Sequence, residues 1–388
     1  MRRSASFSSF RFSSEASDAP AEPYYPEGSA KFMLRDSRLT IDFSLPSSPD
    51  AAVPLSYSAK NVLYFSRGNR VQSKNMVAAD AVTQLCKLKD KHGDLKLLAA
   101  GGALLALATT KGVVQIWDTQ LKTMVGSWTT KGVASMAWNG PVLCIGGLKG
   151  AIRQYDTRIE PISKMKEQVF KVTRHQAAIS ALSWNRDGRL LASGDESGIV
   201  YCWDARSKVP LDVGEFVQRR KKIQHQKGIS ALAWSPWQAK LLATGDISGT
   251  VKLWTIDAGT AHSNATALSK LELGSKIVNL HFSPNYKELV TTLGSLAEPP
   301  EGIANLNRAW PRGILSNAIV VHSFPTLRQV STASVSEQDA CGSILHTAGA
   351  VHKLVVAVPG ESKLKVFDVW GKRKEVRRQS SSLGNAIR

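Results

Sequence analysis

The sequence has few cysteines and no long apolar segment. Its four cysteines lie far apart and form no CxxC pair, which argues against a disulfide scaffold. No window approaches the roughly 18 uninterrupted apolar residues of a membrane helix, so no segment is expected to span a membrane. Each cysteine lies in or near an apolar run, and we expect four reduced core thiols in an intracellular protein: Cys86, Cys144, Cys202 and Cys341.

Motifs for catalysis and for metal binding are also missing. The sequence contains no P-loop, no HExxH motif and no clustered Cys/His spacing. The segments GDESG and GDISG place serine fourth, whereas the nucleophile elbow G-x-S-x-G needs it third. The sequence therefore predicts a protein that is not an enzyme, with no catalytic residue, no metal site and no cofactor.

Acidic residues are scarce relative to basic ones. The chain has 31 Asp and Glu against 50 Lys and Arg, a formal net charge of +19. Such a surface favours acidic partners, although solvated loop charge explains it equally well. Two basic runs, RRKK (219–222) and KRKEVRR (372–378), are either nuclear-import signals, electrostatic patches or solvated charge. We expect the protein in the nucleus and cytoplasm, with no membrane partner.

What the sequence does contain is an internal repeat. Residues 175–204 (HQAAISALSWNRDGRLLASGDESGIVYCWD) align with residues 225–255 (HQKGISALAWSPWQAKLLATGDISGTVKLWT). Fainter copies end in GVVQIWD and GAIRQYD, at Asp118 and Asp156. Alternating strands separated by glycine-containing turns, with His near the start and Trp-Asp near the end, are typical of WD-repeat blades.

Counting outward from this pair predicts an all-β, seven-bladed WD-repeat β-propeller over residues 52–370. The expected blades lie near 52–88, 92–129, 132–172, 175–224, 225–273, 275–330 and 339–370. Residues 1–50 are rich in Ser, Pro and Ala and predict a mostly disordered leader. A strand near 38–43 is a candidate latch that pairs with the last blade. Residues 371–388 predict a flexible basic tail that ends in Ile-Arg.

The most prominent polar residues of the repeat have structural interpretations. His175 and His225 occupy the blade-start position, where a histidine hydrogen-bonds within its own blade. Asp195 and Asp246 follow glycine in turns between apolar strands, where aspartate is a common turn former. Neither pair predicts catalysis.

Several stretches closely resemble one particular group of WD-repeat proteins. They are AWSPWQAKLLATGD (233–246), GSKIVNLHFSP (274–284), KELVTTLGS (287–295), KGVVQIWD (111–118) and the terminal Ile387-Arg388. Together they resemble the Fizzy and Fizzy-related co-activators of the anaphase-promoting ubiquitin ligase. The divergent first blade, with NVLYFSRGNRV (61–71), is similar to the meiosis-specific fungal activators of that family.

The resemblance implies a substrate-recruiting activator subunit that is not itself catalytic. The family's terminal Ile-Arg docks into tetratricopeptide-repeat scaffold subunits of the ligase, so Ile387 and Arg388 are the expected ligase-binding residues. Ile387 suits an apolar pocket, and Arg388 offers a guanidinium fork beside the free α-carboxylate. The expected partners are these scaffold subunits and degron-containing substrates, and nucleic acid is not expected.

Some positions depart from the family pattern. The leader motif Asp-Arg-Phe/Tyr-Ile-Pro has no match. Either the chain is truncated at its N-terminus, which we favour, or this member binds the ligase differently. Ser56 replaces an acidic residue before the first-blade aromatic Tyr57, Glu196 stands in a turn that usually carries asparagine, and Lys365 replaces an arginine. Tyr57, Glu196 and Lys365 are the candidate degron-binding face. An Arg/Leu-type destruction box at the junction of the first and seventh blades fits this pattern better than a Lys-Glu-Asn degron.

A second hypothesis rests on charge alone. A WD-repeat scaffold for a nuclear nucleic-acid or chromatin complex would account for the charge of +19. Its binding would weaken steeply with added salt.

Overall fold

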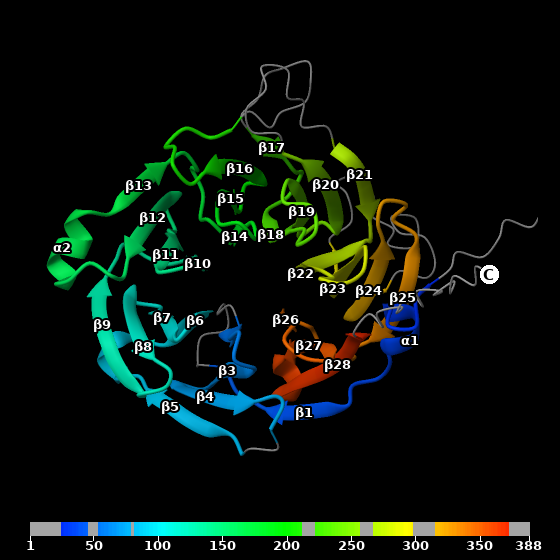
Figure 1. The fold of residues 1–388 in the computed structure, drawn as a ribbon, viewed down its shortest axis with the longest axis horizontal. Helices are drawn as coiled ribbons and strands as arrows, with labels where there is room; N and C mark the ends of the chain where they lie inside the picture. Colours follow the sequence, from blue (N-terminus) through cyan, green and yellow to red (C-terminus); the bar gives the residue numbers. More distant parts are fainter. Residues whose placement is uncertain are drawn as a thin grey trace, which may run out of the picture.

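The chain folds as a ring of small β-sheets. The computed structural model describes residues 25–45, 53–78, 81–211, 222–256, 267–297 and 315–371. These residues form seven four-stranded antiparallel sheets arranged around a central axis (Figure 1). The predicted all-β, seven-bladed propeller is confirmed.

Each of the first six blades is built from four consecutive strands. Blade 1 contains β2 (Leu55–Tyr57), β3 (Val62–Arg67), β4 (Arg70–Asn75) and β5 (Thr83–Lys87), and blade 2 contains β6 (Leu95–Gly101), β7 (Leu104–Thr109), β8 (Val113–Asp118) and β9 (Thr123–Thr129). Blade 3 contains β10 (Ser135–Asn139), β11 (Val142–Gly146), β12 (Ala151–Asp156) and β13 (Phe170–Thr173), and blade 4 contains β14 (Ala181–Trp184), β15 (Leu190–Gly194), β16 (Ile199–Asp204) and β17 (Ile223–Gln224). Blade 5 contains β18 (Ile229–Trp234), β19 (Leu241–Asp246), β20 (Thr250–Thr255) and β21 (Ala267–Glu272), and blade 6 contains β22 (Ser275–Phe282), β23 (Glu288–Leu296), β24 (Ala318–Ser323) and β25 (Gln329–Ser334).

The seventh blade combines the two ends of the described chain. Its strands are β26 (Gly342–His346), β27 (Val351–Val358) and β28 (Lys363–Gly371), and its outer strand is β1 (Leu39–Asp42). Strand β1 pairs antiparallel with β28, with Leu39 opposite Val366 and Asp42 opposite Lys363. In Figure 1 the two strands lie side by side at the lower right. This pairing closes the ring and covers the outer edge of β28.

The apolar cores lie between neighbouring blades. Strand β19 is buried along its whole length, as expected for a strand covered on both faces. A glycine at or near the end of the second strand lets the next blade approach closely. A Cβ atom built on it would lie 2.5 to 2.8 Å from an isoleucine of the following blade in three pairs: Gly146–Ile179, Gly194–Ile229 and Gly245–Ile277.

The leader is more ordered than the sequence predicted. Residues 25–45 contain the short helix α1 (Ala30–Met33) and strand β1. Strand β1 is the latch strand predicted near 38–43, and that prediction is confirmed. The expectation of a mostly disordered leader over 1–50 is wrong for the rest of this stretch, because the leader's apolar side chains complete two inter-blade cores. Ala30 packs between blades 6 and 7, while Ile41 and Phe43 pack between blades 7 and 1. The remainder of the leader, residues 1–24 and 46–50, lies outside the described residues.

Three of the four cysteines lie in the core. Cys86, Cys144 and Cys202 are buried and unpaired, as predicted. Cys341 is exposed, and its prediction as a core thiol is wrong. It precedes the first residue of β26, and its Sγ lies 3.6 Å from the backbone oxygen of Asp339. Of the helices described, none is long and apolar enough to cross a membrane.

Candidate functional site

The histidine of blade 4 is the centre of a buried hydrogen-bond network. His175 Nδ1 lies 2.7 Å from Asp195 Oδ2, and His175 Nε2 lies 2.7 Å from Ser193 Oγ. The indole N–H of Trp203 donates to the same Ser193 Oγ at 2.8 Å. Since the carboxylate only accepts, Nδ1 of His175 carries the proton and donates it to Asp195.

Blade 5 repeats the arrangement with a threonine. His225 lies 2.8 Å from both Asp246 Oδ2 and Thr244 Oγ1, and Trp254 Nε1 donates to Thr244 at 3.0 Å. Burial lowers the pKa of His225, although the Asp246 hydrogen bond opposes that shift. The His225 and Asp246 side chains are 0% and 1% exposed. This constellation contains the residue types of a hydrolase triad, but a substrate has no access to it, so we assign it the structural role predicted from the sequence.

The aspartate of the network also shapes the turn between β15 and β16. Asp195 Oδ1 accepts from Ser197 N at 3.0 Å, Ser197 Oγ at 2.7 Å and Ile199 N at 2.9 Å. Burial alone would raise the pKa of Asp195, but the hydrogen bonds from His175, Ser197 and Ile199 outweigh it and lower that pKa. The turn is therefore rigid.

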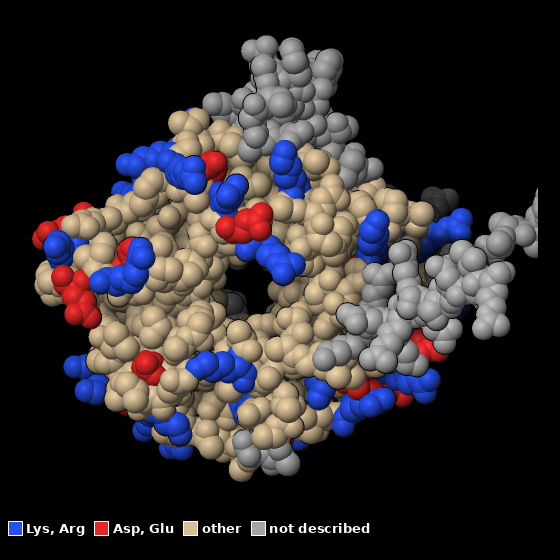
Figure 2. Space-filling model, in the orientation of Figure 1, with Lys and Arg blue, Asp and Glu red and all other residues tan. Residues whose placement is uncertain are grey.

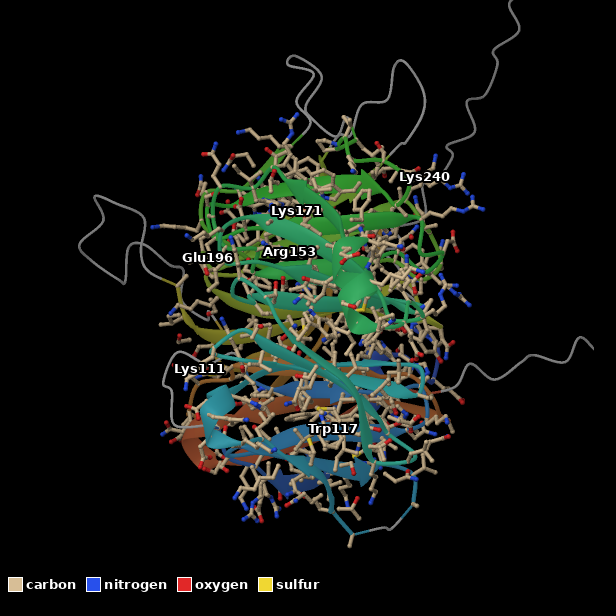
Figure 3. All side chains as sticks on the ribbon, turned by 90° about the vertical axis from the view of Figure 1, so that its left-hand side faces the viewer. Lys111, Trp117, Arg153, Lys171, Glu196 and Lys240 are labelled. Carbon is tan, nitrogen blue, oxygen red and sulfur yellow. The ribbon has the colours of Figure 1, made fainter. Side chains whose placement is uncertain are left out.

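Glu196 lies at the tip of this turn and is exposed. Gly198 completes the turn at φ +84°, and a Cβ atom there would lie 2.6 Å from the backbone oxygen of Lys227. Figure 3 shows Glu196 and Lys111 at one face of the ring and Lys240 at the opposite face. Glu196 is thus presented to solvent by a rigid turn, as a residue that binds a partner must be.

Tyr57 lies at the junction of blades 1 and 7 and is half-buried. Its ring is 4.4 Å from that of His346, at an interplanar angle of 31°. His346 Nε2 donates to Asn61 Oδ1 at 2.6 Å, which links the seventh blade to the first. Burial raises the pKa of Tyr57. The Tyr57 hydroxyl is buried and has no hydrogen-bond partner among the described residues.

Lys365 faces the junction of blades 6 and 7 rather than that of blades 7 and 1. Its ammonium donates to the backbone oxygen of Val335 at 2.9 Å and lies 2.9 Å from Glu361 Oε2, and its side chain is only 16% exposed. Hydrogen bonds from Ser336 and Lys365 lower the pKa of Glu361. A ligand carboxylate would have to compete with Glu361 for this cation.

The structure places the three candidate degron residues on three different blades. Tyr57 lies on blade 1, Glu196 on blade 4 and Lys365 on blade 7. Only Tyr57 lies at the junction of the first and seventh blades, so the three do not form one contiguous site there. Their role in degron binding stays a prediction. The predicted ligase-binding residues, Ile387 and Arg388, lie outside the described residues.

A buried carboxylate that the sequence reasoning missed joins the leader to the propeller. Glu288 Oε2 accepts from Trp370 Nε1 at 2.6 Å and from Ala30 N at 3.2 Å. Burial raises the pKa of Glu288, and the two hydrogen bonds oppose that shift. The only signal in the sequence was a lone acid beside the apolar run LVTTL, which predicts no partner. Within the described ranges, no group of His, Cys, Asp or Glu side chains could hold a metal ion.

Mild acid should destabilise the propeller because several histidines are buried in their neutral form. Burial lowers the pKa of His322 and of His346 to about 4, whereas an unfolded histidine titrates near 6.5. Between these values the unfolded state binds more protons, so stability falls as pH falls, by up to about 1.4 kcal/mol per pH unit for each such histidine. Glu288, with its raised pKa, contributes with the opposite sign.

The measurement is thermal unfolding at pH 7.5, 6.5 and 5.5. We expect a progressively lower Tm, and a smaller decrease for His322→Gln, whose side chain cannot gain a proton. An unchanged Tm across this range would contradict the assignment of neutral buried histidines.

The comparisons with known proteins agree with the repeat found in the sequence. The family model "WD domain, G-beta repeat" matches residues 166–204 and 217–255, which contain the networks of His175 and His225. Among curated proteins, the chain is 28% identical to "Protein FIZZY-RELATED 1" of Arabidopsis thaliana, over 84% of this chain and 60% of that protein. It is also 28% identical to "Cell division cycle 20.1, cofactor of APC complex" of Arabidopsis thaliana, over 62% of this chain and 51% of that protein.

The resemblance to the Fizzy and Fizzy-related proteins is thus confirmed. The chain spans 60% and 51% of the lengths of these two relatives. A chain in the "Crystal Structure of Mitotic Checkpoint Complex" shares the fold, with a TM-score of 0.70 over 94% of this chain and 99% of that one. At 22% sequence identity this likeness shows the fold alone.

Proposed function

We propose that the protein is a non-catalytic activator subunit of the anaphase-promoting complex, which recruits substrates to that ubiquitin ligase. The observation that carries the proposal is the similarity to a relative named as a cofactor of that complex, extending over 62% of this chain. The closed propeller supports it, because its rigid turns present side chains such as Glu196 to solvent without the mobility of an isolated loop.

In this proposal the propeller and the tail have separate tasks. The propeller binds degrons, with Tyr57, Glu196 and Lys365 as candidate contacts, and Ile387-Arg388 binds the ligase scaffold. A linker of the polar, basic composition of residues 371–388 is expected to let the two events occur together without fixing the orientation of the propeller. We extend the proposal to a meiotic role and to a location in the nucleus and cytoplasm, both of which rest on the sequence alone.

Charge gives little support to the alternative, a nucleic-acid scaffold. On the face shown in Figure 2, Lys and Arg are scattered from the outer rim to the edge of the central opening, with Asp and Glu among them, rather than gathered in one continuous patch. A nucleic-acid interface needs several cations on one surface.

The test is ubiquitin transfer by the purified anaphase-promoting complex freed of its own activators. Adding the full chain should increase the ubiquitination of a protein that carries an Arg/Leu-type destruction box, and mutating that box should remove the increase. An unchanged rate with a ligase that responds normally to a known activator would refute the proposal.

A further inference from the structure

One face of the ring is held rigid by hydrogen bonds between neighbouring turns. Each turn follows the innermost strand of a blade. Asn139 Nδ2 donates to the backbone oxygen of Gly188 at 2.8 Å, Asn185 Nδ2 donates to that of Ala239 at 3.3 Å, and Trp237 Nε1 donates to that of Ser283 at 3.2 Å. Blades 3, 4, 5 and 6 are therefore joined in series. This face includes Lys240 and is opposite the one that presents Glu196 (Figure 3).

The centre of this face is hollow. Figure 2 shows an opening at the centre of the ring, and a cavity of about 580 Å³ lies there among residues of blades 4 to 7. We call this cavity the channel mouth. Residues that matter for its chemistry are Trp184, Arg186, Asn279, His281, Phe282 and Leu345. A volume of this size suits a ligand of a few residues.

The polar lining of the channel mouth suits a ligand group that carries a negative charge and accepts hydrogen bonds. Among the described residues that line it there is no Asp or Glu, and Arg186 is the only cationic side chain. Arg186 is exposed and makes one long contact, from Nη1 to the backbone oxygen of Pro236 at 3.3 Å. Its neighbour Asp187 forms no ion pair with it in the described structure. The guanidinium fork therefore retains N–H groups for a carboxylate.

Two neutral polar side chains lie in the same cavity. Asn279 Oδ1 accepts from Ser343 N at 2.9 Å, and His281 Nε2 lies 3.3 Å from Ser343 Oγ. Because its Oδ1 is engaged, Asn279 has its Nδ2 hydrogens to offer to a ligand. These groups suit the backbone carbonyls of a peptide.

Apolar side chains complete the lining. Phe282, Leu345 and Leu232 are part of the wall, together with two prolines, Pro236 and Pro284. A nucleic acid would need several cations, whereas this wall offers one cation among neutral polar and apolar side chains. A short peptide that combines apolar and acidic side chains fits that combination. The hydrogen bonds between neighbouring turns already hold blades 4, 5 and 6 in place. Binding therefore costs little conformational entropy of the protein.

We propose that the channel mouth binds a short extended segment of a partner protein in which an acidic side chain lies between apolar residues. The acidic side chain pairs with Arg186, and the apolar residues contact the partly buried Leu232 and Leu345. The site is separate from the candidate degron residue Glu196, on the opposite face, and does not rest on the proposed function.

The test uses the full chain and two fluorescein-labelled peptides, acetyl-Gly-Leu-Glu-Leu-Gly-amide and its Glu-to-Gln counterpart. Fluorescence anisotropy should show saturable binding of the glutamate peptide and about tenfold weaker binding of the glutamine peptide, since a hydrogen bond to a charged group is worth more than a neutral one. Arg186→Gln should weaken binding of the glutamate peptide by a similar factor.

Arg189→Gln is the matched control. Arg189 lies three residues further along, is exposed and does not line the cavity, so its replacement changes the net charge equally and should leave binding unchanged. Both variants should keep the Tm of the parent chain. Equal loss in both variants, no difference between the two peptides, or no saturation at millimolar protein would overturn the proposal, as would tighter binding of a single-stranded oligonucleotide that competes for the same site.

Discussion

Removal of residues 25–44 is expected to destabilise the propeller by about 5 kcal/mol or more, which is comparable to the whole stability of many domains. The expectation follows from where the buried apolar side chains of this segment lie. Leu34 is 5% exposed and packs between blades 6 and 7. Ile41 is 5% and Phe43 3% exposed, and both pack between blades 7 and 1. Each such side chain contributes about 1.5–3 kcal/mol.

Backbone and polar contacts add to this cost. Without β1, the outer edge of β28 is open, and a propeller with an open blade is prone to association through that edge. Arg38 loses its 3.1 Å ion pair with Asp368, and Glu288 loses one of its two donors. The deletion variant should therefore be recovered unfolded or aggregated.

Two point variants keep the prediction measurable if the deletion variant does not fold. Phe43→Ala should lower the unfolding free energy by about 3–5 kcal/mol, whereas Phe32→Ala, at a 48% exposed phenylalanine of the same segment, should change it by under about 1 kcal/mol. The measurement is denaturant unfolding of the parent chain and of the Phe43→Ala and Phe32→Ala variants. Equal stability of the Phe43 and Phe32 variants would mean that the leader does not close the ring.

The sequence predicted the fold because the blade signature is local. Strands are indicated by alternating apolar and polar residues, and the repeat of blades 4 and 5 by a histidine near the start and a tryptophan near the end. The degenerate blades 1, 6 and 7 lack this signature but keep apolar runs such as LVVAV (354–358), which lies in β27. These segments were counted as blades because a propeller must form a closed ring.

The site could be predicted less well because it depends on contacts between distant residues. Lys365 was assigned to the same candidate degron-binding face as Tyr57, yet alternation along β28 places Leu364 and Val366 toward blade 1 and Lys365 toward blade 6. The sequence names the residues but not the face on which each lies. Likewise, nothing local marks Glu288 as the acceptor for Trp370 and Ala30, which are 82 and 258 residues away.

Loss of Ile387 and Arg388 is expected to weaken binding to the anaphase-promoting complex by about 100-fold or more. An isoleucine that fills an apolar pocket and an arginine that pairs through its fork each contribute about 1.5–3 kcal/mol when fully engaged. The seven blades are complete within the described residues, so the deletion should leave the Tm unchanged. A variant with two glycines added after Arg388 should lose binding too, because the α-carboxylate is moved away from the arginine.

The decisive measurement for the proposed function is the affinity of the purified anaphase-promoting complex for the full chain and for the chain lacking only Ile387-Arg388. We expect tight binding of the full chain and a loss of about 100-fold on deletion, with both proteins equally stable. Equal affinity for the two, or no binding of either, would contradict the proposed role of the tail and favour a propeller scaffold that binds its partners through charge.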